Sequence, residues 1–193
     1  MLALAMRYPL AFSLVLLCAA APAKPAKYHF VLAEVALAPS APAELSVKAR
    51  SLFDQIVAAR PEVVQTLDNA PDPGKDPAGY RKYLDSHGVR AYALKLKIDQ
   101  YERSLAPALP PGKRKVLTIR LNVALVGAQI PGDVLALAGS GGASVTAEVG
   151  EPLRPREEEG ALDDVLKEAL THALDDALAK LQAPPRKAVR KKK

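Results

Sequence analysis

The sequence from residue 89 to residue 99 reads Val89-Arg90-Ala91-Tyr92-Ala93-Leu94-Lys95-Leu96-Lys97-Ile98-Asp99. Large apolar side chains occupy every second position of its centre: Tyr92, Leu94, Leu96 and Ile98. Polar and charged side chains fill the positions between them. A period of two places each set on one face of a β-strand. The stretch therefore predicts a strand with one apolar face and one polar face.

The same alternation returns in a later segment, and a further strand is expected after it. Residues 115–126 place a row of apolar side chains on one parity (Leu117, Ile119, Leu121, Val123 and Leu125) and Thr118, Arg120 and Asn122 on the other. Residues 134–149 follow after Pro131-Gly132, a dipeptide typical of a tight turn. These segments predict a hairpin beside the first strand. The apolar face of such a sheet needs a covering layer.

Helical periodicity supplies candidates for that layer. Residues 161–181 carry leucines four positions apart: Leu162, Leu166, Leu170, Leu174 and Leu178. A second helix is predicted to be capped by Ser40 or Ala41, to have Glu44 in its first turn and to end at Arg60-Pro61, and it also carries an apolar stripe. A short helix is predicted from Asp76-Pro77 to Gly88, because Pro suits a first helical position and Gly suits a helix end.

Two further strands are expected, at residues 28–37 and 62–67. The order is strand, helix, strand, short helix, three strands and a long helix. We therefore predict an α+β (mixed α/β) fold: a two-layer sandwich of an about five-stranded mixed sheet covered by two long helices and one short helix. Parallel pairing is expected early and antiparallel pairing later.

The front of the chain has the pattern of a secretory signal peptide over residues 1–23. Arg7 precedes a short apolar run, and Ala21-Pro22-Ala23 is a small-residue cleavage pattern. Cys18 is the single cysteine of the chain, so lipidation there is the alternative, although the bulky Leu17 departs from that pattern. A single globular domain is predicted over residues 28–182, with no transmembrane helix in the mature chain, and a disordered basic tail over residues 183–193.

The net charge of +6 arises from the ends of the chain. Without Arg7 and the basic residues after Gln182, 20 basic residues remain against 21 acidic residues. The tail is a candidate polyanion contact, with these basic residues: Arg186, Lys187, Arg190, Lys191, Lys192 and Lys193. An anionic membrane or cell-wall polymer suits such a tail, whereas nucleic acid is disfavoured because no aromatic residues are interleaved with the charges.

No motif in the sequence indicates an enzyme, a cofactor or a metal. The run Gly139-Ser140-Gly141-Gly142 lacks the Lys-Ser/Thr ending of a phosphate-binding loop, so a bulge or flexible bend in a strand is expected there. His29, His87 and His172 are scattered and have no ligand-type partner at helical spacing. Ser140 and Ser144 lie outside any nucleophile elbow. Adjacent aspartates at 163–164 and 175–176 point apart on a helix and indicate solvation.

The segment from Gly88 to Glu102, together with the strands and the final helix after it, resembles bacterial envelope proteins related to the LpoB, CsgG and TolB N-terminal domains. The resemblance covers residues 28–181 and rests on element order. Val126-Gly127-Ala128-Gln129 departs from it, because the acidic residue before the hairpin turn is absent. The resemblance implies a non-enzymatic accessory or assembly protein of the envelope and transfers no binding residue.

The sequence thus favours an exported protein of the periplasm or outer envelope that binds an envelope protein partner and catalyses nothing. Two alternatives stay open: a small-ligand-binding module with a cleft near residues 139–142, and a tether that holds an anionic surface through the tail. A hydrolase would require a perturbed acid or base beside Ser140 or Ser144.

Overall fold

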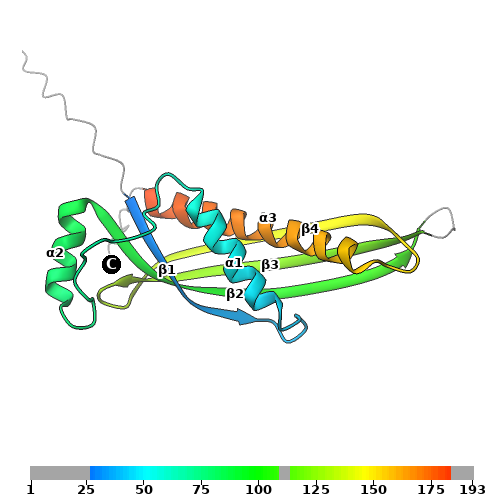
Figure 1. Cartoon of the computed structure of the whole chain (residues 1–193), viewed down its shortest axis with the longest axis horizontal. Coiled ribbons are helices and arrows are strands. Elements are labelled where there is room, and N and C mark those ends of the chain that lie inside the picture. Colours follow the sequence, from blue (N-terminus) through cyan, green and yellow to red (C-terminus); the bar gives the residue numbers. More distant parts are fainter. Residues whose placement is uncertain (1–26, 109–113, 184–193) are drawn as a thin grey trace, which may run out of the picture.

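The structure, a computed structural model, describes residues 27–108 and 114–183. Its centre is one four-stranded sheet in the order β1-β2-β3-β4 (Figure 1). The strands are β1 (Lys27–Leu37), β2 (Val89–Pro107), β3 (Arg114–Ile130) and β4 (Val134–Gly150). β1 pairs with β2 in parallel, and the β2–β3 and β3–β4 pairs are antiparallel. The α+β class and the mixed sheet are confirmed.

The predicted strand at residues 62–67 is wrong, so the sheet has four strands rather than about five. Val63 forms a single bridge with Tyr28, in which Tyr28 N–H donates to Glu62 O and Val64 N–H donates to Tyr28 O. The next acceptor, Val64 O, bonds the imidazole Nδ1 of His29 at 2.9 Å instead of a backbone group. Side-chain hydrogen bonding of this kind replaces the next step of a ladder.

Two helices lie side by side over one face of the sheet, which we call the covered face (Figure 1). They are α1 (Leu45–Ala58) and α3 (Pro155–Gln182). The apolar parity predicted for β2 and β3 is confirmed, because Leu94, Leu96 and Ile98 are fully buried beneath them. The ion pair Lys48–Asp163 at 2.7 Å joins the helices, and Arg60, just beyond the end of α1, pairs with Asp175 of α3 at 2.5 Å.

Both long helices begin at residues other than those expected. The N-cap of α1 is Glu44, without a side-chain hydrogen bond, rather than Ser40 or Ala41. α3 starts at Pro155 instead of residue 161, inside a stretch expected to be a connection. Pro155 suits the first helical turn, and the carboxylate of Glu157 accepts a hydrogen bond from Arg154 N–H at 3.2 Å. These local contacts extend the helix beyond its leucine repeat.

The short helix α2 (Pro77–His87) packs on the opposite face, at one end of the sheet (Figure 1). Its Tyr80 and Leu84 form a small second core with Val89 and Ala91 of β2. Ala91 has the opposite parity to Tyr92, so it lies on the face that α1 and α3 leave uncovered. The described helices therefore cover one side of the sheet along its length and the other side only at this end.

We expect Asp76→Ala to lower the free energy of unfolding by about 1 kcal/mol. The Asp76 carboxylate accepts a hydrogen bond from Gly79 N–H at 2.8 Å and caps the first turn of α2. Urea denaturation measures the loss. Lys75→Ala, at the preceding exposed position, serves as the control and should leave stability unchanged; equal losses in the two variants would show that the cap contributes nothing.

No helix in the part of the chain described by the structure is both long and apolar enough to cross a membrane. The predicted signal peptide, Cys18 and the basic residues of the tail lie outside the described residues.

Candidate binding surface

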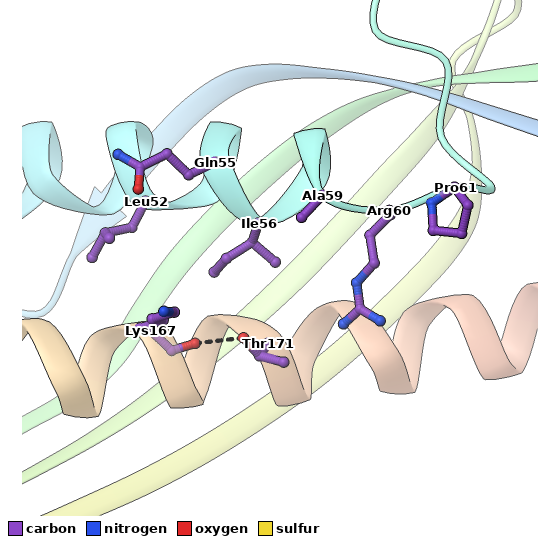
Figure 2. Close-up of a pocket in the computed structure, with 8 residues that line it drawn as sticks. All are labelled: Leu52, Gln55, Ile56, Ala59, Arg60, Pro61, Lys167 and Thr171. Atoms are coloured by element: carbon purple, nitrogen blue, oxygen red, sulfur yellow. Dashed lines mark hydrogen bonds between the residues drawn. The ribbon is translucent and has the colours of Figure 1, made fainter.

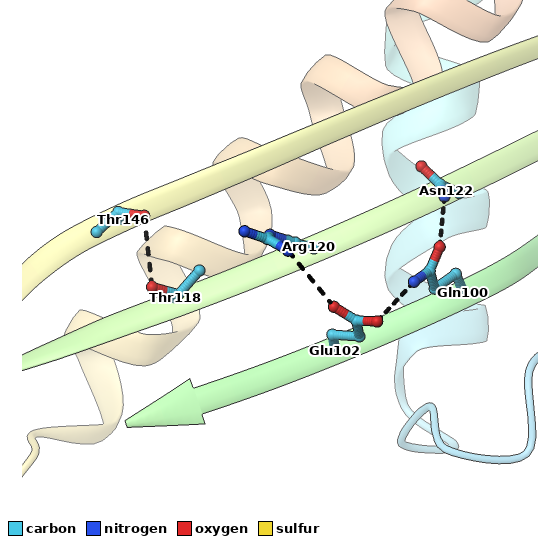
Figure 3. A network of polar contacts seen from close by, with 6 residues as sticks. All are labelled: Gln100, Glu102, Thr118, Arg120, Asn122 and Thr146. Atoms are coloured by element: carbon cyan, nitrogen blue, oxygen red, sulfur yellow. Dashed lines mark hydrogen bonds and ion pairs between the residues drawn. The ribbon is translucent and has the colours of Figure 1, made fainter. Parts of the chain in front are cut away.

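The face of the sheet opposite to α1 and α3, beyond α2, carries no helix among the described residues; we call it the open face (Figure 1). Polar side chains cross it in a row that we call the polar lane: Gln100, Glu102, Thr118, Arg120, Asn122 and Thr146 (Figure 3). The register sets this arrangement, because Gln100, Glu102 and Thr118 pair across the strands with Asn122, Arg120 and Thr146. Directly opposed side chains of one sheet face interact closely.

Hydrogen bonds connect most of the polar lane (Figure 3). The amide of Asn122 donates to Gln100 Oε1 at 2.6 Å, and Gln100 Nε2 donates to Glu102 Oε1 at 2.6 Å. The guanidinium of Arg120 lies 4.0 Å from Glu102 Oε2. All of these groups are exposed, so they remain able to exchange these partners for groups of a docked molecule.

A bulge at Asp99 brings the β2 side chains into the lane. The β2–β3 register shifts between Ile98 and Gln100, which leaves Asp99 as the additional residue. Without the shift, Gln100 would share the parity of Ile98 and face the buried side. The polar parity of Thr118, Arg120 and Asn122 is predicted by the alternation in the sequence, whereas the residues that the bulge turns toward them are not.

The rest of the open face combines short apolar side chains with paired charges. Val31 and Val126 are 44% and 39% exposed. Lys95 pairs with Glu34 at 2.9 Å, so charges of both signs lie on the same face as these two valines. Protein interfaces that form and dissociate have this mixed composition.

The helical side of the molecule carries two grooves. One lies between α1 and α3 and has a volume of about 490 Å³ (Figure 2). Leu52 and Ile56 provide its apolar lining, and Lys167, Thr171 and Arg60 provide its polar rim. The other groove, of about 580 Å³, lies beside Tyr101 and Arg103 of β2 and the first turns of α3. We call it the edge groove.

Two residues that line the edge groove, Arg103 and Glu158, form an ion pair. Arg103 donates through Nε and Nη2 to the two carboxylate oxygens of Glu158. The hydrogen bond from Arg103 holds the pKa of Glu158 below its usual value. Burial, and then the carboxylate of Glu158, raise the pKa of the Tyr101 hydroxyl beside them.

The Arg103–Glu158 pair predicts an acid-dependent loss of stability. Because the folded pKa of Glu158 is depressed, its contribution is present above the ordinary glutamate pKa and is lost as the pH falls through the folded value. Glu158→Gln should therefore lose less stability between pH 7 and pH 3 than the parent, by less than about 1 kcal/mol because the pair is partly exposed. Urea denaturation at several pH values checks this. Glu168→Gln, on the outer side of α3, should retain the full acid dependence.

The glycine run does not form the expected bulge or flexible bend. Residues 139–142 belong to the regular ladder of β4, and the register shift of the β3–β4 pair lies between Gly127 and Ala128. Gly139 and Gly141 face α3, where a Cβ atom would overlap the backbone oxygens of Ala173 and Ala169. The run therefore permits a close approach of helix and strand.

Side chains of α3 bind the outer edge of the same strand. The Asp176 carboxylate accepts from Ser140 N–H at 2.9 Å, and Lys180 lies 2.6 Å from that carboxylate. These two contacts hold the pKa of Asp176 below its usual value, with Lys180 the larger cause. The imidazole Nδ1 of His172 lies 3.3 Å from Gly142 O. These side chains thus satisfy polar groups that an edge strand leaves unpaired.

The other candidates from the sequence are not brought together. His29, His87 and His172 lie on β1, α2 and α3, and among the described residues no three His, Cys, Asp or Glu side chains cluster as a metal site would require. The exposed depression beside the glycine run has a volume of about 390 Å³ and includes Ser140 but no histidine. The tail residues 186–193 lie outside the described residues, so the structure places no polyanion site there.

No protein-family model matches the chain, and no curated protein matches its sequence. Solved structures with a similar layout include a minor lipoprotein from Acinetobacter baumannii, with 12% identity, a TM-score of 0.36 and coverage of 79% of this chain and 91% of that one. The PelC dodecamer from Paraburkholderia phytofirmans has 14% identity, a TM-score of 0.39 and coverage of 82% and 88%. A protein of Caulobacter crescentus described as a lipoprotein has 15% identity, a TM-score of 0.39 and coverage of 77% and 92%. Bacterial lipoproteins are thus among the similar structures, and none of them transfers a site to this chain.

Proposed function

We propose that this chain is an exported envelope protein that binds another protein through the open face and catalyses no reaction. The observation that carries the proposal is a sheet face that, within residues 27–108 and 114–183, no helix covers beyond α2 (Figure 1). Export rests on the signal pattern of residues 1–23, and the accessory role rests on the chemistry of the open face.

The open face suits a protein better than a small molecule. Its charges are already paired, as in Lys95–Glu34 and Arg120–Glu102. A protein partner with complementary charges can replace the present partner of each charged side chain, so that no charge is left buried and unpaired. Exposed Val31 and Val126 add apolar area that contact would remove from water.

Site-specific photocrosslinking tests the proposal. A benzophenone side chain at Ala124, in the middle of the open face, should yield a discrete adduct with one envelope protein. The same group at Lys82, on the exposed side of α2, is the control and should yield none. Arg120→Glu should abolish the Ala124 adduct, since it places like charges beside Glu102. Adducts of equal yield from both positions, or none from Ala124, would contradict the proposal.

A small-ligand-binding function is the second candidate. The groove between α1 and α3 has a volume of about 490 Å³, within the range of ligand sites, and combines Leu52 and Ile56 with the polar groups of Lys167 and Thr171 (Figure 2). A thermal-shift screen would identify a ligand, because binding to the native state raises the unfolding temperature. A hit should lose its effect in Ile56→Arg and retain it in Arg120→Glu.

A further inference from the structure

In the described part of the chain, the far end of β2 has no neighbouring strand on the side away from β3. β1 pairs with β2 only as far as Leu37 and Ile98, whereas β2 continues to Pro107. Ala108 N–H donates to Arg114 O on the β3 side, while Tyr101 O accepts from Ser40 Oγ at 3.0 Å on the other side. We call the residues Tyr101 to Leu105 the free edge.

The backbone of the free edge is available for hydrogen bonding at Arg103 and Leu105, whereas Tyr101 O already accepts from Ser40 Oγ. Successive residues of a strand direct their backbone groups to alternate sides, so Arg103 and Leu105 present theirs on the same side as Tyr101. Within the described residues, no backbone or side-chain group bonds Arg103 or Leu105 from that side. Pro107 has no N–H group, which limits the available segment to the residues before it.

The edge groove lies directly beside the free edge and shares Tyr101 and Arg103 with it. Its apolar lining includes Pro42 and Leu162. A strand added to the free edge would direct every second side chain toward this groove. Exposed backbone groups beside a side-chain groove are the two parts of a β-augmentation site, in which backbone bonds give affinity and the groove gives specificity.

The charges of the edge groove favour a cationic occupant. Arg103 is paired with Glu158, and Lys48 is paired with both Asp163 and Glu159. Glu44 makes no ion pair with any described residue. The carboxylates of the groove therefore outnumber its cations, and an incoming lysine or arginine finds a carboxylate that is free to pair.

We propose that the basic segment Arg186-Lys187-Ala188-Val189-Arg190 of a second copy of this chain adds as a strand to the free edge. Alternate positions place either Ala188 or Val189 toward the groove, with a cation two residues away on each side. In either register, the apolar residue of the segment can contact Leu162 while a neighbouring cation pairs with Glu44. This pairing uses the sheet edge, so it does not depend on whether the open face binds a protein.

The geometry of α3 requires a second copy. The edge groove lies at the first turns of α3, and the basic segment follows its other end. A helix of 28 residues is about 42 Å long, whereas the four residues from Gln182 to Arg186 span at most about 14 Å. The segment therefore cannot reach the groove of its own chain, and copies would join head to tail.

Peptide binding to a chain that ends at Gln182, which retains every helix and strand of the structure, tests the pairing. A fluorescent peptide of residues 183–193 should bind this chain, as measured by anisotropy, and Glu44→Gln with Glu159→Gln should weaken binding about fivefold or more. Two further peptides carry N-methyl groups, one at Lys187 and Val189 and the other at Ala188 and Arg190. One of these two peptides should bind about tenfold more weakly than the unmodified peptide, or worse, because only one set of amides faces the free edge.

Sedimentation of the full chain gives the second readout. Association should rise with concentration and be absent from the chain ending at Gln182. Equal binding of both N-methylated peptides would overturn the strand pairing. A peptide that binds vesicles containing phosphatidylglycerol but not the protein would overturn the proposal and leave the segment as a membrane tether.

Discussion

Gly141→Ala is expected to lower the free energy of unfolding by about 3 kcal/mol. The added Cβ would overlap the backbone oxygen of Ala169 and lie 2.5 Å from the backbone nitrogen of Ala173. Backbone atoms within a helix cannot rotate away as a side chain can, so α3 would have to shift from β4. Urea denaturation measures the loss, and reduced protection of Ser140 N–H in hydrogen exchange would show that its Asp176 contact is disturbed as well.

Gly142→Ala is the matched control at the next residue. Its Cβ would approach Asn122 Oδ1 at 2.5 Å, but the Asn122 side chain is exposed and able to rotate. We therefore expect the free energy of unfolding of Gly142→Ala to stay within about 0.5 kcal/mol of the parent value. If both variants were equally destabilised, the close packing of α3 on β4 would not be the reason for the glycines.

Leu121→Ala is expected to lower the free energy of unfolding by about 3 kcal/mol. The Leu121 side chain is 1% exposed beneath the helical layer, and its removal leaves a cavity. Asn122→Ala, one residue later on the open face, should cost less than about 1 kcal/mol, since it loses only an exposed hydrogen bond to Gln100. Urea denaturation of the pair compares the two faces of β3 directly. A similar cost at both positions would mean that the open face is not open in the folded protein.

Alternating or helical patterns predicted the central elements from the sequence. The parity of Leu94, Leu96 and Ile98 placed one face of β2 correctly, and the leucine repeat identified α3. Asp76 and Gly88 marked the ends of α2, where Gly88 adopts a left-handed φ of 64°. In each case the structure that the local sequence pattern favours is also the one that the tertiary packing stabilises.

The features that the sequence did not reveal depend on contacts between distant segments. The far part of β2 was missed because residues 100–107 have no apolar alternation, and its strand form comes from pairing with β3. The bulge at Asp99, which turns Gln100 and Glu102 onto the open face, is likewise set by the register. The role of Gly139 and Gly141 depends on contacts with Ala169 and Ala173 in the middle of α3, which no local pattern around the glycines reveals.

The central claim is that the open face is a surface for a protein partner, and thiol labelling tests it most directly. Asn122→Cys lies on the open face, and Lys82→Cys on α2 is the control; mass spectrometry of each peptide measures the modified fraction. We predict that both thiols are labelled in the purified protein, whereas only the thiol at residue 122 is protected in intact cells. Equal labelling of the two positions in cells would contradict the account.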